Sequence, residues 1–351
     1  KYISEEDYCK FKITPQINDI FMTRIGSIGV CTVVDREEPL AYYVSLALLR
    51  PNVEILNSYF LKYAIESFEG QKELYKRTLV NAVPIKVNKD DIGKILVPVP
   101  PLDVQQEIVY ILDKFTKLDA GLQTELKARK KQYEYYQEKL FTFKNDVKRK
   151  NILDVISMKA RVGWQALTKK EYLSEGEYCL ITGTDFLESG CIRFNSCVYV
   201  SKERFDMDDN IKVHVNDILM TKDGTIGKVA FMEAEPPKPT TLNGGVYRLT
   251  IISEELLPKY AYYYFTSYEF KCFVEKVKTG GTIKHLTQKW FETLKIPVPS
   301  IEEQREIIRI MDTLNNLCNN TEIGLPAEIE ARHKQYEYYR DKLLTFKRKV
   351  V

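Results

Sequence analysis

Histidine is scarce in this chain, and cysteine occurs without the spacing that metal sites need. The 351 residues include three histidines and seven cysteines, and no two cysteines form a C-x-x-C pair. None of the histidines lies near a pair of cysteines, which argues against a zinc motif. An odd number of scattered cysteines is typical of free thiols in a reducing compartment. We therefore expect a cytoplasmic protein with free, buried thiols and no bound metal.

Catalytic signatures are also missing. The sequence has no G-x-x-x-x-G-K-[ST] nucleotide loop, no G-x-G-x-x-G turn, no G-x-S-x-G elbow and no H-E-x-x-H. Its Pro-Pro steps, Pro100-Pro101 and Pro236-Pro237, lack the Asn-Pro-Pro-aromatic setting of adenine methyltransferases. The acidic residues around Asp206 have the pattern of a solvated loop. We expect a chain without catalytic residues and without a cofactor of its own.

Long apolar runs and a strong net charge are absent as well. No stretch of about 20 apolar residues occurs, so we expect no membrane-spanning helix. The formal charge is +3 and the pI about 8.3. Bulk charge therefore neither requires nor excludes a nucleic-acid partner, and any basic surface must be a local patch.

What the chain does contain is a repeat. Residues 129–144 read RKKQYEYYQEKLFTFK and residues 332–347 read RHKQYEYYRDKLLTFK, with 12 of 16 positions identical at an offset of 203. A second pair, Asn18–Gly29 and Asn216–Gly227, matches at an offset of 198. Apolar β-formers flank glycines in both copies of this pair, which predicts a strand, a tight turn and a second strand.

Each RKKQYEYY-like copy ends a segment with helical periodicity. Prolines at 98–101 and 297–299 close a short extended stretch, and Ser300 with Glu303 fits a capping box at the start of a helix. Apolar and tyrosine residues then recur at steps of three and four, which predicts a coiled-coil seam. We place on this seam Leu126, Arg129, Tyr133, Tyr136, Leu140, Phe143, Ile329, Arg332, Tyr336, Tyr339, Leu343 and Phe346.

The first helix is expected to be long: a continuous helix from about 104 to about 144 would be ~60 Å long at 1.5 Å per residue. Gly121 and the Gly324–Pro326 step each offer a place for a break. Arg129 and Arg332 are expected either to pair across the coil or to set its register.

The repeats predict an α+β chain in four parts. They are a first α/β domain (1–97), a helical spacer (98–147), a second, similar domain (148–297) and a second helical spacer (298–351). Two like domains and two like helices predict pseudo-twofold symmetry with antiparallel helices. The first domain has no counterpart of residues 151–198, so we expect that its N-terminal part precedes Lys1.

Polar and basic residues on the glycine-rich turns are the candidates for nucleic-acid contact. A glycine turn needed only for its backbone angles is the alternative reading. The candidates, chosen as hydroxyl, amide and cationic groups suited to phosphate, are Thr23, Arg24, Ser27, Arg161, Thr221, Lys222, Thr225, Lys228, Asn243, Thr282 and Lys284.

Together these patterns resemble the DNA-specificity (S) subunits of type I restriction–modification systems. The resemblance rests on Asn216–Lys228, on the I-P-V-P stretch that leads into Glu303–Ile307, and on its earlier copy, P-V-P-P leading into Gln105–Ile108. Leu122–Leu126 resembles the short spacer repeat of the family's central helix. The order domain, helix, domain, helix covers nearly the whole chain.

The resemblance implies a non-catalytic subunit. Each target-recognition domain would read one half of a split duplex-DNA site, and the helices would hold the halves apart. The helices would also dock two methyltransferase (M) subunits that carry S-adenosylmethionine and methylate adenine, while restriction (R) subunits would cut. A coiled-coil protein scaffold that never touches DNA is the alternative, and a single-chain enzyme is the third hypothesis.

Overall fold

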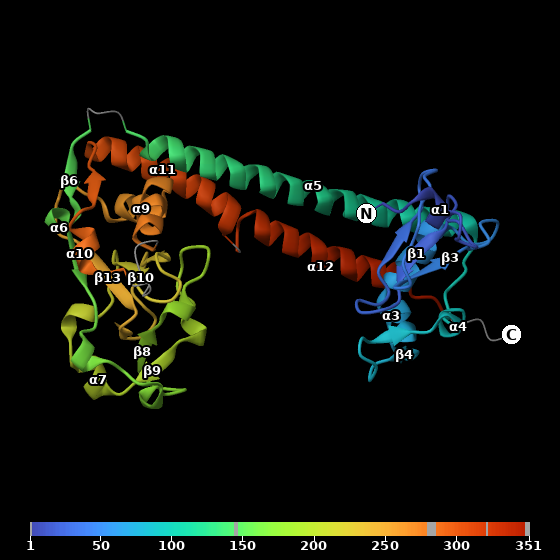
Figure 1. Ribbon diagram of the computed structural model, residues 1–351, viewed down its shortest axis with the longest axis horizontal. Coiled ribbons are helices and arrows are strands. Elements are labelled where there is room, and N and C mark those ends of the chain that lie inside the picture. Colours follow the sequence, from blue (N-terminus) through green and yellow to red (C-terminus); the bar gives the residue numbers. More distant parts are fainter. Residues whose placement is uncertain (1, 144–146, 279–285, 321, 348–351) are drawn as a thin grey trace. The chain divides into compact units, whose positions relative to one another are not determined.

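The computed structural model describes residues 2–143, 147–278, 286–320 and 322–347. The chain divides into two compact units (Figure 1). Unit 1 comprises Lys1–Thr124 and Glu328–Val351, and unit 2 comprises Glu125–Ala327. Each of the two α/β domains therefore groups with segments of both helical regions. The four domain boundaries expected from the sequence stay a prediction.

Unit 1 combines a small antiparallel sheet with short helices. Its elements are α1 (Glu5–Tyr8), β1 (Ile20–Thr23), β2 (Cys31–Val33), β3 (Leu46–Leu49), α2 (Ser58–Glu66), α3 (Phe68–Tyr75), β4 (Thr78–Leu79), β5 (Lys86–Val87) and α4 (Lys89–Ile92). The first part of α5 (Leu102–Phe141) and most of α12 (Leu325–Leu343) complete it. The sheet order is β2-β1-β3, and β4 pairs with β5. Ile20 and Met22 of β1 are fully buried in its core.

Unit 2 contains the same kind of sheet with additional strands. Its elements are β6 (Arg149–Asn151), α6 (Ile152–Val155), β7 (Ile156–Lys159), β8 (Tyr178–Ile181), β9 (Val198–Val200), α7 (Lys202–Asp206), β10 (Ile218–Thr221), β11 (Val229–Phe231), β12 (Thr240–Leu242), β13 (Val246–Ile251), α8 (Pro258–Thr266), α9 (Tyr268–Lys278), α10 (Gln288–Phe291), β14 (Lys295–Pro297) and α11 (Ile301–Asn319). Its sheets have the orders β11-β10-β13-β7, β12-β8-β9 and β14-β6. Single 3₁₀ turns lie at η1 (Gly163–Gln165), η2 (Lys169–Glu171), η3 (Gly183–Asp185), η4 (Phe194–Ser196) and η5 (Asp209–Ile211).

The predicted strand–turn–strand repeat is confirmed down to its register. Ile20 pairs with Val33 in unit 1, and Ile218 pairs with Phe231 in unit 2. Asn18 and Asn216 both have positive φ, 71° and 67°. The 198-residue offset read from the sequence is therefore the offset of the hydrogen-bonded ladder.

The tyrosine-rich segment after β13 forms two helices, α8 and α9. Ser267 ends α8 in an extended conformation, with φ −68° and ψ 163°, and its hydroxyl accepts from the Phe270 N–H at 3.4 Å at the start of α9. In unit 1, Ser67 separates α2 from α3 in the same way, with φ −69° and ψ 163°. A serine at this step is favoured because its side chain satisfies an N–H that the new helix leaves free.

The long helix of the first copy is continuous, whereas that of the second copy is broken. α5 has 40 residues and passes through Gly121 without interruption. The second copy divides into α11 and α12 around Gly324, where an added Cβ would lie 2.4 Å from the Asn316 carbonyl oxygen. The offset between the copies grows from 199 at the prolines before each helix to 203 at Arg129 and Arg332, so the second copy has four additional residues. The break lies in the stretch that contains them.

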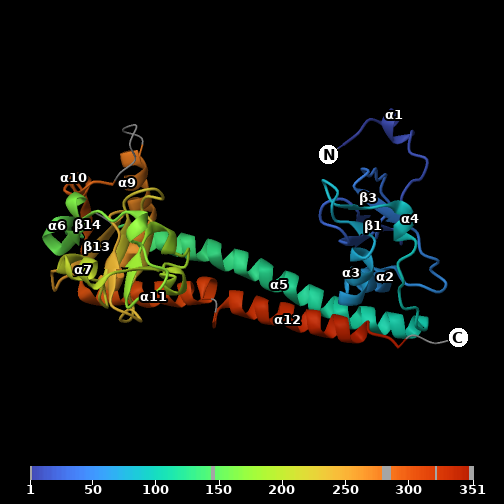
Figure 2. The same cartoon turned by 90° about the horizontal axis from the view of Figure 1, so that it is seen from below.

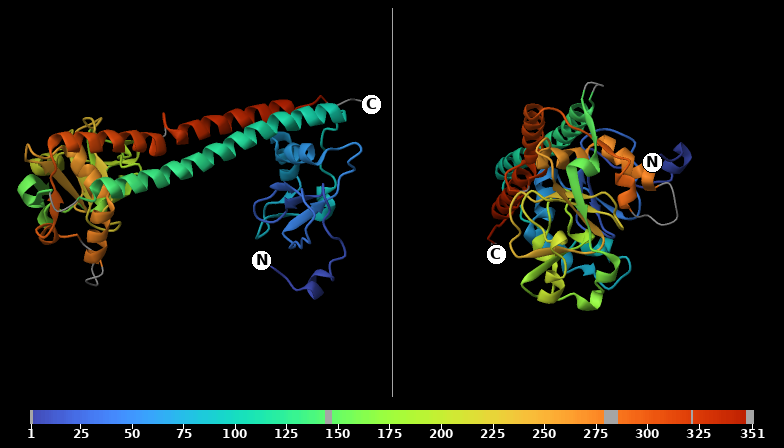
Figure 3. Two further views of the ribbon diagram at one scale, coloured as in Figure 1. Left: turned by 90° about the horizontal axis from the view of Figure 1, so that it is seen from above. Right: turned by 90° about the vertical axis from the view of Figure 1, so that its left-hand side faces the viewer.

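In each unit the paired helices run antiparallel and lie side by side (Figures 2 and 3). In unit 1 the Phe115 ring of α5 stacks on Tyr339 of α12 at 5.6 Å and lies 6.5 Å from Tyr336. In unit 2 the Tyr133 side chain of α5 packs against the core to which α8 and α11 contribute.

The remaining seam positions are mostly half-buried. This group comprises Leu126, Tyr136, Leu140, Phe143, Ile329 and Leu343, while Phe346 is partly exposed and lies 6.5 Å from Phe60. Arg129 and Arg332 differ from the expectation of a cross-coil pair. Each bonds to side chains of its own helix: Arg129 to Gln132 and Glu125, and Arg332 to Gln335 and Glu328.

All seven cysteines are free thiols, as expected. Four of them are buried, but Cys9 and Cys191 are exposed, so the expectation of burial is wrong for these two. In the described part of the chain, no helix is long and apolar enough to cross a membrane.

Candidate nucleic-acid interface

The turn between β10 and β11 is closed by its own threonine. The Thr221 hydroxyl donates to the Thr225 carbonyl and accepts from the Lys228 N–H at 3.0 Å. Gly224 and Gly227 have φ values of 70° and 84°, which residues with a side chain rarely adopt. The turn is thus a rigid projection between two strands, and Thr225 and Lys228 are exposed on it.

Unit 1 builds the same turn between β1 and β2. The Thr23 hydroxyl donates to the Ser27 carbonyl and accepts from the Val30 N–H at 3.0 Å. Gly26 and Gly29 take the positive φ values, 77° and 86°. Ser27 is exposed on this turn.

The basic residue that follows the threonine is used differently in the two units. Lys222 is half-buried, and its ammonium lies 5.2 Å from the centre of the Tyr247 ring. The Arg24 guanidinium instead donates to the carbonyls of Val87 and Val44, each at 3.1 Å. Arg24 therefore holds loops of unit 1 together, while Lys222 keeps a partly accessible charge.

Candidate residues from distant parts of the sequence lie close together beside the β10–β11 turn of unit 2. The Lys222 N–H donates to the Gly245 carbonyl at 2.9 Å, and the Asn243 N–H donates to the Ile181 carbonyl at 2.9 Å. The Asn243 side chain donates to the Tyr172 hydroxyl at 2.5 Å. The glycine turn and the loop after β12 therefore form one surface.

Arg161 lies in the interior of unit 2, beneath this surface, and binds β12. Its side chain is buried, and it donates to the Leu242 carbonyl at 2.9 Å and to the Thr241 hydroxyl at 3.2 Å. Burial lowers the pKa of Arg161, and the charge of Arg204 lowers it further. Arg161 and the equally buried Thr221 thus hold the backbone of the loops and are closed to an external ligand in this conformation.

Other polar residues at this end were not singled out from the sequence. Thr184 is exposed on η3, next to Gly183, where an added Cβ would lie 3.7 Å from Thr221. Lys169 and Lys170 are exposed on η2, directly before Tyr172. The adjacent lysines are visible in the sequence, but only the bond between Tyr172 and Asn243 shows that they lie by the turn. Thr282 and Lys284 lie outside the described residues.

A buried aspartate that pairs with an arginine anchors the sheet behind each turn. Asp217 accepts from Arg248 Nε at 2.7 Å, from the Thr250 hydroxyl at 2.6 Å and from the His214 N–H at 2.8 Å. In unit 1, Asp19 accepts from Arg50 at 2.6 and 2.8 Å. Burial of Asp19 acts to raise its pKa, but its bonds to Arg50 and to the Gln16 N–H outweigh this and hold the pKa below its usual value.

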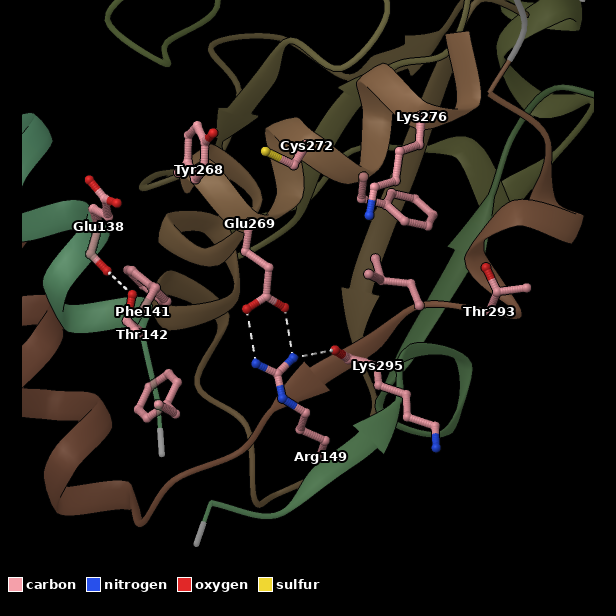
Figure 4. Close-up of a pocket in the computed structure, with 13 residues that line it drawn as sticks. Glu138, Phe141, Thr142, Arg149, Tyr268, Glu269, Cys272, Lys276, Thr293 and Lys295 are labelled. Atoms are coloured by element: carbon pink, nitrogen blue, oxygen red, sulfur yellow. Dashed lines mark hydrogen bonds and ion pairs between the residues drawn. The ribbon is translucent and has the colours of Figure 1, made fainter. Parts of the chain in front are cut away.

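The described residues contain no group of three or more His, Cys, Asp or Glu side chains arranged to hold a metal ion. A cavity of about 570 Å³ lies in unit 2 where the end of α5, β6 and α9 meet. Its carboxylate Glu269 is paired with Arg149 by two bonds of 2.7 and 2.9 Å (Figure 4). The Glu269 carboxylate of this cavity is therefore already neutralised by Arg149.

Comparison with known proteins identifies the family. Residues 1–128 and 144–331 match the type I restriction modification DNA specificity domain. This chain belongs to that family. It is 35% identical over 258 residues to the type I restriction enzyme EcoR124I/EcoR124II specificity subunit of Escherichia coli, which covers 72% of this chain and 63% of the relative.

Solved structures of the family share the fold. The S subunit of a type I restriction–modification system from M. genitalium is similar over 96% of this chain and 85% of its own, with a TM-score of 0.58 and 17% identity. A chain from a structure of type I R-M complex assembly and conformational transition covers 94% and 82%, with a TM-score of 0.65 and 15% identity. The expected α+β fold with two similar domains and a long helical connection is thereby confirmed.

Proposed function

We propose that this specificity chain reads a bipartite duplex-DNA site, one half with each unit, through the strand–turn–strand projections. The observation that carries the proposal is the recurrence of one glycine turn in both units. In each unit a threonine hydroxyl donates to a carbonyl of its own turn, and the flanking strands pair in the same register. Such a projection can place exposed hydroxyl and ammonium groups against phosphates while neighbouring loops reach base edges.

We further propose that the helices dock two methyltransferase subunits, with restriction subunits joining the same complex. S-adenosylmethionine would then be bound by the methyltransferase partners. The absence of nucleotide-binding motifs from this sequence supports that division of labour. Lys130, Lys131 and Lys334 are exposed on α5 and α12 and leave a polar helix face for such partners.

The test is duplex-DNA binding by the chain assembled with its methyltransferase partner. We expect a preferred sequence and an affinity that falls steeply as salt increases, because phosphate contacts release counterions. The chain alone, incubated with DNA and S-adenosylmethionine, should yield no methylated product. DNA binding that is absent or insensitive to salt would favour the protein scaffold, and methylation by the chain alone would favour an enzyme.

Reversing the charge of Lys228 should weaken DNA binding without unfolding unit 2. Lys228→Glu removes an exposed ammonium from the turn and introduces repulsion, so we expect about a tenfold loss of affinity near 0.1 M salt and a salt slope reduced by about 1. Lys148→Glu, an equally exposed lysine before β6, is the matched control. Equal losses for the two variants in a fluorescence-anisotropy titration would contradict a specific role for the turn.

Lengthening α5 should lengthen the gap in the DNA site. α5 is continuous through 119–128, the stretch that contains the spacer-like Leu122–Leu126. Two added helical turns, about seven residues, extend a helix by roughly 10 Å, which corresponds to about three base pairs at ~3.4 Å per pair. Mapping of methylated adenines in a host that expresses the variant measures the gap. An unchanged gap would show that the helix does not set the spacing.

A further inference from the structure

The side-chain amide of Asn243, in the loop after β12, is oriented by its own backbone. Asn243 Oδ1 accepts from the Gly245 N–H at 2.9 Å, which forms an Asx turn. The Asn243 carbonyl accepts from the Val246 N–H at 3.1 Å in the same loop. Because this turn occupies the oxygen of the amide, the nitrogen points the other way. Asn243 therefore presents a donor, and not an acceptor, to the group on its other side.

The group on that side is the hydroxyl of Tyr172. Asn243 Nδ2 donates to the Tyr172 oxygen at 2.5 Å. An amide nitrogen does not accept hydrogen bonds, so the proton of the tyrosine hydroxyl is not shared with Asn243. Among the described residues, the Tyr172 hydroxyl has no other hydrogen-bond partner. Its proton is therefore directed away from Asn243, toward an acceptor that the described part of the chain does not supply.

The chain is held in place on both sides of Tyr172. Before it, the Glu171 carboxylate accepts from Arg204 Nε at 2.7 Å. After it, the Leu173 N–H donates to the Tyr199 carbonyl and the Tyr199 N–H donates to the Leu173 carbonyl, each at 2.9 Å. A group whose neighbours are fixed in this way keeps its direction when a ligand arrives, and specific recognition depends on such pre-organisation.

Groups suited to phosphate contact lie next to this hydroxyl. Lys169 and Lys170 are exposed and closely precede Tyr172, which is half-buried. The loop that binds the tyrosine is also joined to the glycine turn, since the Lys222 N–H donates to the Gly245 carbonyl at 2.9 Å. Phosphate contacts position a protein on duplex DNA, whereas donors and acceptors of fixed direction read base edges. Tyr172 has a donor of fixed direction, with lysines suited to phosphate beside it.

We propose that Tyr172 is a specificity-determining residue of unit 2, whose hydroxyl donates to a major-groove acceptor of guanine or thymine, and that Asn243 is the positioning residue that directs its proton. Guanine presents O6 and N7 and thymine presents O4 as acceptors, whereas cytosine presents a donor. This inference rests on the proposed reading of duplex DNA and assigns the chemistry of one contact in it. Unit 1 has Tyr43 at the position of Asn243, by the matching registers of β3 and β13, so the contact belongs to one half of the site.

Tyr172→Phe removes the hydroxyl and keeps the ring. For the chain assembled with its methyltransferase partner, selection from a random duplex library measures the preferred base at each position. We expect the wild-type chain to reject cytosine at one position of one half-site. The variant should discriminate against cytosine there about fivefold to tenfold less, the value of one hydrogen bond, with an unchanged salt slope. Tyr199→Phe, which removes a half-buried hydroxyl from β9, is the matched control and should keep the wild-type preference.

Asn243→Asp tests the direction of the proton. The new carboxylate can still accept from the Gly245 N–H, but its second oxygen replaces the nitrogen that faces Tyr172. The tyrosine hydroxyl must then donate to this carboxylate and present a lone pair to the DNA, so the preferred base at that position should change to cytosine or adenine, which present donors. The same substitution in the Tyr172→Phe background controls for the added charge and should lower affinity without changing the preferred base. No change of base in Asn243→Asp would overturn the role of Asn243.

The remaining outcomes separate this inference from the proposed function. A wild-type chain that selects a defined sequence, with the same sequence selected by Tyr172→Phe, would overturn the role of Tyr172 and leave DNA reading intact. Loss of preference at many positions, with a lower midpoint of urea unfolding, would show that Tyr172 only supports the loop, which also overturns the inference. A wild-type chain without any sequence preference would overturn the proposed function itself.

Discussion

Replacing Asp217 by alanine should lower the free energy of unfolding of unit 2 by about 3–5 kcal/mol. The Asp217 side chain is 1% exposed and is the common acceptor for Arg248, Thr250 and the His214 N–H. Its removal leaves the Arg248 guanidinium in a largely buried place without its carboxylate. Urea unfolding followed by circular dichroism measures the loss.

Asp209→Ala is the matched control for this substitution. Asp209 pairs with Lys212, but its side chain is 85% exposed, so the variant should change stability by at most about 0.5 kcal/mol. Comparable losses for the two variants would contradict the assigned role of burial. Because β10 carries the glycine turn and pairs with β13, which carries Arg248, the Asp217 variant should also weaken DNA binding in proportion to the unfolded fraction.

Replacing Gln105 by leucine should cost unit 1 about 3 kcal/mol or more. The buried Gln105 amide donates to the carbonyls of Ile55 and Pro100 at 2.9 and 2.7 Å and accepts from the Asn57 N–H at 2.8 Å. Leucine has a similar volume, so the substitution removes the three bonds and leaves buried backbone groups without partners. The midpoint of urea unfolding measures the effect.

The neighbouring glutamine gives the control within the same turn of α5. Gln106 is exposed, so Gln106→Leu should leave the midpoint nearly unchanged. The same shift for both substitutions would show that the loss comes from leucine on the helix and not from the three bonds. In unit 2, Gln304 makes the equivalent contacts, with Glu255, Pro299 and Leu257. Each helix start is therefore tied to its own recognition domain by one buried amide.

The strand–turn–strand projections and the helix starts could be predicted because their signals are local. Glycines required at positive φ, and a serine with a glutamate three residues later, act through neighbours in the chain. The capping box at Ser300 forms as expected, with the Ser300 hydroxyl accepting from the Glu303 N–H at 3.3 Å. The Gly324–Pro326 step could likewise be recognised as a place for a break.

The roles of individual polar side chains could not be predicted in this way. Arg161 was expected on the surface that meets DNA, yet it is buried against the backbone of β12, 80 residues later in the chain. Arg24 and Lys222 occupy equivalent positions and make different contacts, because their surroundings come from loops that differ between the units. Their sequence context alone does not contain those partners.

The sequence by itself determined that this protein is a duplicated α+β chain with strand–turn–strand projections and long helices, because repeats and periodicity depend on residues close together in the chain. Only the tertiary structure decided which side chains of the candidate interface are accessible. Exposure depends on which distant segments pack together, and that is a property of the folded chain.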